Sequence, residues 1–274
     1  MLPHPLSLKK LSVFLLVQFI ANLALAQVYN SSISAATGGT GRATVEVGDS
    51  TFLNPAAQVH LRGQYFFASG AEDEFAITLS DNTEESMFPA TLGYVQRTTD
   101  VTQGEMKQSD IMLSLAEFVV DKWAFGITGH YIEQKLPESS YRQPNVDIGI
   151  MYTPKSYIGW GLVVYNAFGE NKDAPTNIRY KTTVGGGFNY IYKEAMRFRL
   201  DATSESFFGA GLETYVNRFL ITRIGYANDT DDERELLTAG MGFKGPRFAL
   251  NYAYQGNQKF SGDYRHSVDL EIPF

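Results

Sequence analysis

The sequence contains no cysteine, so neither a disulfide nor a lipid attached through an N-terminal cysteine contributes to the fold. After residue 25 it contains no apolar run of about 18 residues, the length that a membrane-spanning helix needs. Its formal net charge is −7, whereas a nucleic-acid partner requires a basic face. On composition alone, a secreted β-sandwich and a membrane-spanning β-barrel both remain open.

Signals for catalysis and metal binding are also scarce. The four histidines form no His-x-x-x-His or Glu-x-x-His pair, and no Gly-x-Ser-x-Gly sequence is present. His60 and His130 fall on a face that could line a lumen, where lone histidines are usually structural. We therefore predict that the protein is not an enzyme and uses no cofactor or metal.

The N-terminus has the pattern of a secretory signal peptide. Lys9–Lys10 precedes an apolar run, Leu11–Leu25, which ends in the small-residue pattern Ala24–Ala26. We predict cleavage after residue 26 and export. The remaining 248 residues then carry a formal charge of −9, because the segment removed contains two lysines and no acid.

The rest of the chain alternates between apolar and polar residues with period two. Aromatic residues make up 14% of the sequence, and mean hydropathy is slightly negative, as expected when a polar lumen offsets a lipid-facing surface. Residues 58–274 predict an all-β, antiparallel transmembrane barrel of about 14 strands. The expected segments are Gln58–Ala68, Glu74–Ser80, Phe88–Arg97, Ser109–Val120, Lys122–Ile132, Val146–Thr153, Tyr157–Phe168, Ile178–Tyr190, Glu194–Thr203, Phe207–Val216, Phe219–Ala227, Glu235–Phe243, Arg247–Gln255 and Tyr264–Phe274.

The last segment supports a place in the outer membrane of a Gram-negative-type bacterium. Apolar residues occupy alternate positions up to the terminal Phe274, with Asp269 and Glu271 on the opposite face. This resembles the terminal strand of bacterial outer-membrane proteins, which implies that insertion machinery recognises it.

Outer loops are expected at Thr98–Gln108, Glu133–Asn145, Gly169–Asn177 and Asn228–Arg234.

Residues 27–57 break the alternation and predict a compact N-terminal plug inside the barrel. The stretch Gly38–Ala57 contains four glycines, an Asp49 and an Asn54-Pro55-Ala56 sequence, which interrupt both strands and helices. An ordinary glycine-rich leader that packs nowhere in particular is the alternative.

Charged and small residues fall on the predicted lumen face. The basic set is Arg62, Arg179, Lys181, Arg197, Arg199, Arg223, Arg247 and Arg265. Acidic partners are Asp147, Asp201, Glu213, Asp269 and Glu271 on the wall, and Glu46 and Asp49 on the plug. We interpret this set as a structural ladder that anchors the plug, or as a basic wall that attracts an anionic head group. Glycines on the same face leave room for the plug, and Gly185–Gly187 is a candidate bend that opens the wall laterally.

Within residues 38–57 the sequence resembles the N-terminal hatch of the FadL-type outer-membrane transporters, including their PorV/PorQ-like branch. The resemblance rests on Gly-Gly-Thr-Gly-Arg-Ala, Gly-Asp-Ser and Asn-Pro-Ala-Ala within residues 38–57. It implies a fourteen-stranded barrel whose hatch passes hydrophobic substrates. The implied hatch residues are Gly39, Gly41, Arg42, Ala43, Asp49, Asn54, Pro55 and Ala56.

Two functions follow from these observations. The first is passive uptake of hydrophobic or amphipathic small molecules, similar to fatty acids, through a plugged lumen. The alternative is an outer-membrane scaffold, or a partner in secretion and assembly, as the PorV-like branch implies. The expected partners are outer-membrane lipid and a hydrophobic small molecule, with no nucleic acid.

Overall fold

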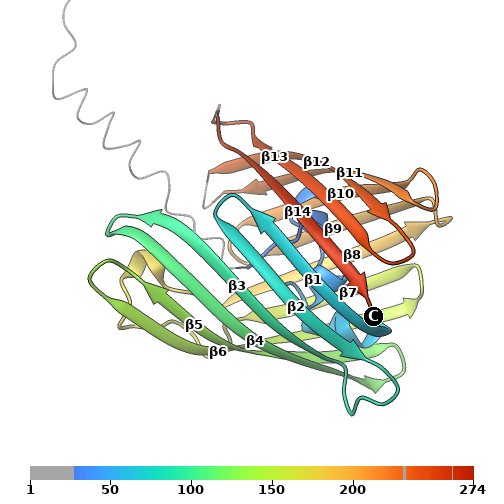
Figure 1. Ribbon diagram of the computed structural model, residues 1–274, viewed down its shortest axis with the longest axis horizontal. Coiled ribbons are helices and arrows are strands. Elements are labelled where there is room, and N and C mark those ends of the chain that lie inside the picture. The colour runs from blue at the N-terminus through green and yellow to red at the C-terminus, as the bar shows by residue number, and fades with distance from the viewer. Residues whose placement is uncertain (1–27, 231–232, 261) are drawn as a thin grey trace, which may run out of the picture.

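The computed structural model describes residues 28–230, 233–260 and 262–274, so the predicted signal peptide, residues 1–26, lies outside the described residues. The described chain forms one closed barrel of fourteen strands (Figure 1). The strands are β1 (Gly63–Ala71), β2 (Glu74–Asn82), β3 (Ala90–Val101), β4 (Gly104–Val120), β5 (Trp123–Lys135), β6 (Ser140–Lys155), β7 (Ile158–Tyr165), β8 (Thr183–Tyr192), β9 (Met196–Thr203), β10 (Phe207–Tyr215), β11 (Leu220–Asp229), β12 (Arg234–Lys244), β13 (Ala249–Asn257) and β14 (Tyr264–Pro273).

Every strand pairs antiparallel with its neighbours in sequence, and β1 pairs with β14 to close the sheet. The closing register runs from Tyr65 opposite Pro273 to Ala71 opposite Ser267. Closure leaves the barrel wall without an edge strand, because each strand has a partner on both sides. The predicted all-β fold and strand number are confirmed.

The outward face of the barrel is apolar and the inward face is mostly polar or small. In β2, for example, Phe75, Ile77 and Leu79 are exposed, whereas the alternate residues Ala76 and Thr78 are buried. In β14, Val268 points outward and Asp269 is completely buried inside. The period-two pattern therefore assigns most strand faces correctly.

The first strand begins at Gly63, five residues later than the predicted start at Gln58. Asn54 caps a 3-10 helix, η1 (Pro55–His60), and Pro55 occupies its first turn, so this segment is helical. The alternation that places Arg62 on the lumen face puts Phe67, five residues later, on the outward face, but Phe67 is buried inside the barrel. It fits there because Gly48 lacks a side chain: a Cβ at Gly48 would lie 2.3 Å from the Phe67 ring.

The barrel has two distinct ends. The terminal end carries the start of β1 and the C-terminal residue Phe274, whose N–H donates to Gln64 O at 3.1 Å. The loop end carries the connection between β7 and β8, residues 166–182, which contains the 3-10 helix η2 (Thr176–Ile178). The strand predicted from Ile178 starts instead at Thr183, because this connection folds back into the barrel mouth.

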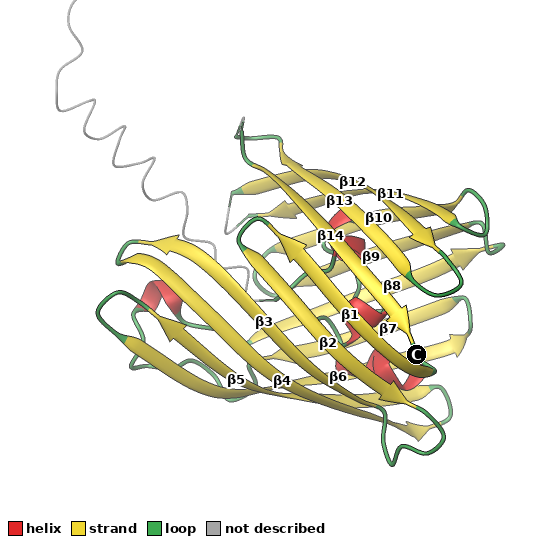
Figure 2. Ribbon diagram, in the orientation of Figure 1, coloured by secondary structure: helices red, strands yellow, loops and turns green. Residues whose placement is uncertain are grey.

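Strands β3 to β6 rise beyond their neighbours at the loop end (Figure 1). The outer loops predicted at Thr98–Gln108 and Glu133–Asn145 are wrong, since both stretches are mostly paired strand that ends in tight turns. Helix η2 lies within these raised strands (Figure 2), where Ile178 and Ala174 pack against Met106 of β4. The prediction failed because both faces of the raised strands are largely polar, which the sequence pattern does not distinguish from a loop.

The wall is continuous at Gly185–Gly187, where the sequence suggested a lateral opening. Gly185 and Gly187 of β8 pair with Val163 and Gly161 of β7, and with Thr203 and Asp201 of β9. The register shifts in the described wall lie elsewhere, between Phe118 and Val120 and between Tyr152 and Lys155. This hypothesis of a lateral gap is therefore wrong.

The segment before β1 lies inside the barrel. It contains the short helices α2 (Ser32–Ala36) and α3 (Val47–Ser50), followed by η1, drawn in red within the strands in Figure 2. Almost all residues from Tyr29 to Val59 are buried. None of the helices in the described residues has the length and apolarity to cross a membrane. We call residues 28–62 the plug.

Candidate functional site

The plug is anchored to the wall first through α2. The Asp269 carboxylate of β14 accepts hydrogen bonds from Ser32 N and Ser32 Oγ, both at 2.7 Å, and from Ser69 Oγ of β1. Hydrogen bonds to a charged group contribute about 1.5–3 kcal/mol each. This buried carboxylate therefore fixes the start of the plug to the strand pair that closes the barrel.

The end of α2 is held by Thr238 of β12. Thr238 Oγ1 donates to Ala36 O at 3.0 Å and accepts from Gly38 N at 3.1 Å. Gly38 has φ +71°, a left-handed backbone that favours glycine, and this conformation turns the chain out of the helix. The wall thus supplies a partner to the backbone at the point where the helix stops.

Asp201 of β9 holds the predicted hatch residues Gly41 and Arg42. Its Oδ2 accepts from Gly41 N and Arg42 N at 2.9 Å and from Arg42 Nη1 at 3.1 Å. The Arg42 guanidinium lies 5.5 Å from the ring centroids of both Tyr165 and Phe207, a cation–π distance. Arg42 is thereby paired, stacked and buried between the plug and the wall.

Asn54 joins three segments of the chain. Its Oδ1 accepts from Ala56 N at 3.1 Å, and its Nδ2 donates to Arg42 O at 2.7 Å and to Ile150 O of β6 at 3.2 Å. Next to it, Tyr165 OH donates to Leu53 O at 2.7 Å. The Asn54 and Tyr165 side chains thus provide hydrogen-bond partners for backbone groups of irregular segments that are buried away from water.

Glycines in the wall allow the plug to approach the strands closely. A Cβ at Gly161 would lie 1.9 Å from Arg42 O, and one at Gly149 would lie 2.1 Å from Asn54 Oδ1. The same kind of contact occurs at Gly126, Gly159, Gly187, Gly209, Gly211, Gly225 and Gly240. The predicted role of the lumen glycines, to make room for the plug, is confirmed.

All eight predicted hatch residues lie in the plug. Gly39 contacts Phe207, Ala43 lies against Gly159, and Pro55 and Ala56 lie against Gly126. Asp49 is buried, and neither of its carboxylate oxygens has a hydrogen-bond partner among the described residues. Burial raises the pKa of Asp49 to about 7.

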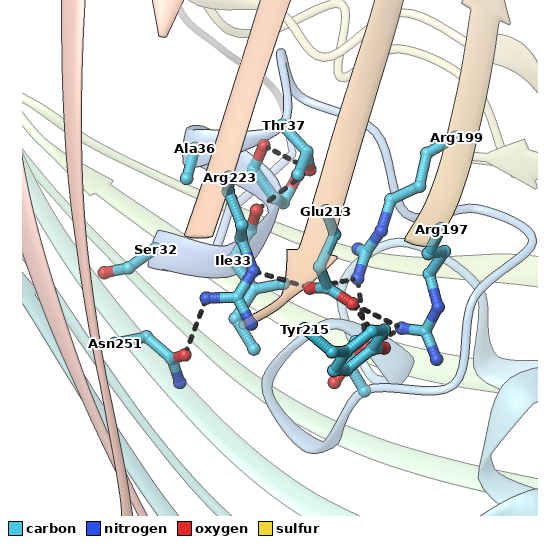
Figure 3. Close-up of polar contacts among 12 residues, drawn as sticks. Ser32, Ile33, Ala36, Thr37, Arg197, Arg199, Glu213, Tyr215, Arg223 and Asn251 are labelled. Carbon is cyan, nitrogen blue, oxygen red and sulfur yellow. Dashed lines mark hydrogen bonds and ion pairs between the residues drawn. The ribbon is translucent and has the colours of Figure 1, made fainter. Parts of the chain in front are cut away.

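The predicted basic residues separate into two groups. Arg197, Arg199 and Arg223 come together inside the barrel around Glu213 (Figure 3). The others do not join them. Arg265 of β14 pairs with Glu74 of β2, near the loop end. Arg62 and Arg247 are exposed beside turns at the terminal end, and Arg179 and Lys181 belong to the 166–182 connection. These last four lie outside the group because the predicted strands do not extend over their positions.

Several site residues were not recognised from the sequence. Tyr165, Phe207 and Thr238 contact the plug, yet a tyrosine, phenylalanine or threonine in an alternating strand carries no distinguishing signal. His130, which the sequence already placed on the lumen face, lies between two carboxylates, 2.9 Å from Asp110 and 3.1 Å from Asp147. Among the described residues, no group of three or more metal-ligating side chains is arranged to hold a metal ion.

The plug leaves small cavities on both sides. On its loop-end side a cavity of about 160 Å³ is lined by Arg42, Tyr165, Phe207, Ala227 and Leu236, among others. A wider vestibule of about 510 Å³ lies at the loop end and is lined mainly by charged and polar residues. On the terminal-end side a cavity of about 180 Å³ adjoins the arginine cluster.

These features define a class: a fourteen-stranded antiparallel barrel whose lumen holds an N-terminal plug. No protein-family model and no curated protein sequence matches the chain. Its fold is nonetheless that of the FadL-type outer-membrane barrels, as three solved structures show.

The toluene transporter TbuX of Ralstonia pickettii matches with a TM-score of 0.74 and 11% identity, over 92% of this chain and all of the other. The monoaromatic hydrocarbon channel CymD matches with a TM-score of 0.69 and 12% identity, over 92% of this chain and 99% of the other. A Pseudomonas aeruginosa FadL homologue matches with a TM-score of 0.67 and 10% identity, over 90% of this chain and 99% of the other. The resemblance noted in the hatch is thus confirmed at the level of the fold.

Proposed function

We propose that the protein is an outer-membrane barrel for passive uptake of hydrophobic or amphipathic small molecules. After removal of residues 1–26, insertion machinery recognises β14 with its terminal Phe274, and the terminal end faces the periplasm. The apolar outward face supports contact with lipid. Similarity in fold to TbuX, a toluene transporter, and to CymD, a monoaromatic hydrocarbon channel, supports a hydrophobic substrate.

The observation that carries this proposal is the amphipathic cavity on the loop-end side of the plug. Phe207, Ala227 and Leu236 contribute apolar surface to it, beside polar and charged side chains that include Arg42 and Glu205. Its volume of about 160 Å³ is below the roughly 300–1,000 Å³ of pockets for drug-sized ligands. The site therefore suits a molecule of about one ring, and passage beyond it requires the plug to move.

A disulfide between plug and wall tests this requirement. A Cβ at Gly93 of β3 would lie 3.4 Å from Thr51 Cγ2, a separation suited to a disulfide between Cys residues at positions 51 and 93. The chain has no cysteine of its own, so the engineered pair would be the only one. We expect liposomes with reduced Thr51→Cys/Gly93→Cys protein to take up a labelled monoaromatic hydrocarbon, and oxidation to abolish the uptake.

The single variant Thr51→Cys, treated with the same oxidant, is the control and should keep its uptake. Equal uptake by the oxidised and reduced double variant would contradict passage past the plug. No uptake by the unmodified protein would contradict the transport function itself.

A scaffold in the outer membrane is the second candidate function. It is favoured by the raised strands β3 to β6, which have their own apolar cluster with Met106, Ala174 and Ile178. Such a packed projection offers a rigid surface to a partner. A stoichiometric protein that co-purifies with the barrel, together with an absence of hydrocarbon uptake, would favour this function.

A further inference from the structure

A buried cluster of charges joins the plug to the wall near the terminal end. Glu213 of β10 accepts from Arg223 Nε at 2.6 Å, from Arg199 Nη2 at 3.3 Å and from Tyr215 OH at 2.6 Å, as Figure 3 shows. Arg197 Nη1 lies 3.4 Å from the same carboxylate. Glu213 is therefore fully engaged by side chains of the wall alone.

The plug contributes the second carboxylate, Glu46. Its Oε1 accepts from Arg199 Nη2 at 3.0 Å and also from Arg197 Nη1. The Glu46 side chain is 18% exposed, compared with 1% for Glu213. Because both arginines also contact Glu213, they keep one partner when Glu46 moves away, so Glu46 is the replaceable member of the cluster.

Positive charge exceeds negative charge here. Three buried arginines meet two carboxylates within 4 Å, and the adjoining rim adds Lys244 and Glu271. This leaves one positive charge in excess while the nearby Asp49, whose charge acts on Arg199, is protonated. Arg197 Nε and both Nε and Nη1 of Arg199 are buried without a hydrogen-bond partner among the described residues. A buried N–H group without an acceptor costs about 1–3 kcal/mol, and more on a charged side chain. Of these groups, Arg197 Nε belongs to a residue that lines the adjoining cavity, where an additional anion would supply an acceptor.

Space for such an anion is present beside the cluster. The cavity of about 180 Å³ is lined by the cations Arg197, Arg223 and Lys244. Its lining also includes the wall carboxylates Glu213 and Glu271 and, on the plug side, Val45 and Glu46. A tetrahedral phosphate or a small carboxylate fits this volume, and guanidinium groups bind both kinds of oxyanion through paired N–H donors.

We propose that this cavity binds a small oxyanion, phosphate or carboxylate, which competes with Glu46 for Arg197 and so loosens the plug around residues 45–47. The ligand takes over hydrogen bonds that Glu46 makes, while Glu213 holds the arginines in place. This anion site is independent of the hydrophobic substrate, so its test is independent of the transport function.

Calorimetric titration of the detergent-solubilised protein with inorganic phosphate, at constant ionic strength in sodium chloride, tests the site. We expect saturable binding that tightens at least fivefold in Glu46→Gln, because the competing carboxylate is lost, and weakens at least fivefold in Arg197→Gln. Arg247→Gln is the matched control, since this arginine is exposed in a turn at the same end. The phosphate affinity of this variant should stay within twofold of that of the native protein.

If Arg197→Gln does not fold, Lys244→Gln at the exposed rim replaces it and should weaken binding two- to threefold. Hydrogen exchange adds a structural readout: phosphate should increase exchange at residues 44–48 and leave residues 32–36 unchanged. A parallel titration with acetate shows which oxyanion is preferred. Non-saturable binding, or equal affinities in Glu46→Gln, Arg197→Gln and Arg247→Gln, would overturn the proposal.

Discussion

Replacing Asp49 by asparagine should remove a pH dependence from the seating of the plug. Asp49 is 1% exposed, and both of its carboxylate oxygens lack a hydrogen-bond partner among the described residues. Burial raises its pKa from 3.8 to about 7, and the charges of Glu46 and Asp269 act in the same direction. The nearby Ser31 hydroxyl, which does not reach the usual geometry of a hydrogen bond, and the charge of Arg199 lower the pKa but do not offset burial.

The sign of the effect follows from the raised pKa. The seated plug binds the Asp49 proton more tightly than a displaced, hydrated plug does, so protonation favours the seated state. This stabilisation is present below the ordinary pKa near 4 and is lost as the pH rises toward 7. A shift of about three pKa units, at 1.36 kcal/mol per unit, corresponds to an upper limit of about 4 kcal/mol.

Hydrogen exchange of residues 47–53, compared between the native protein and Asp49→Asn at each pH, measures this loss. The ratio of the exchange rates of the two proteins at each pH is free of the intrinsic pH dependence of exchange. We expect similar protection at pH 3, below the ordinary pKa of the carboxyl, and at pH 8 at least tenfold faster opening in the native protein, where Asp49 is charged. Glu105→Gln, at an exposed acid of the loop end, should change neither value. A ratio that stays constant from pH 3 to pH 8, or that changes in the opposite direction, would refute the reasoning.

Two further substitutions test the contacts between plug and wall. Gly161→Ala places a Cβ 1.9 Å from Arg42 O and should lower the free energy of unfolding by about 1–3 kcal/mol or more in denaturant titration. Gly70→Ala, which meets no atom within 4 Å, should leave it nearly unchanged. Asp201→Asn leaves the Arg42 guanidinium buried without its counter-charge and should cost about 3–5 kcal/mol in the same titration. Unaltered stability in Gly161→Ala or Asp201→Asn would show that the plug is not seated as described.

The barrel could be predicted from sequence because the membrane-facing requirement is local. Each strand needs apolar residues at alternate positions, and this pattern is visible in β2 or β14 without knowledge of any partner. The exceptions are informative. Phe67 fits the outward pattern but points inward, because its space is created by Gly48, about twenty residues earlier in the chain.

The candidate site could be predicted on the plug side and, on the wall, for the charged residues only. Gly41, Arg42 and Asn54 stand out because glycine, arginine and an Asn-Pro pair interrupt an otherwise regular sequence. Asp201 was predicted as a charge on the lumen face, but its pairing with Gly41 and Arg42 is set by the tertiary fold. Tyr165 and Ile150 O are an ordinary strand residue and a backbone group, which carry no signal of their own. The sequence therefore indicates which residues form the plug and which charges face it, but not which of them pair.

The contacts that hold the plug decide how it can move. Asp269, Thr238 and Asp201 bind backbone groups of residues 32–42 by buried hydrogen bonds, which cost desolvation energy when they break. The segment around Glu46 is held differently, by ion pairs whose arginines keep a second carboxylate partner when the plug carboxylate leaves. Moving the segment around Glu46 away from the wall therefore leaves fewer hydrogen-bonding groups without a partner than moving residues 32–42 would. For this reason we expect the plug to open first at residues 45–47, while α2 remains attached to the strands that close the barrel.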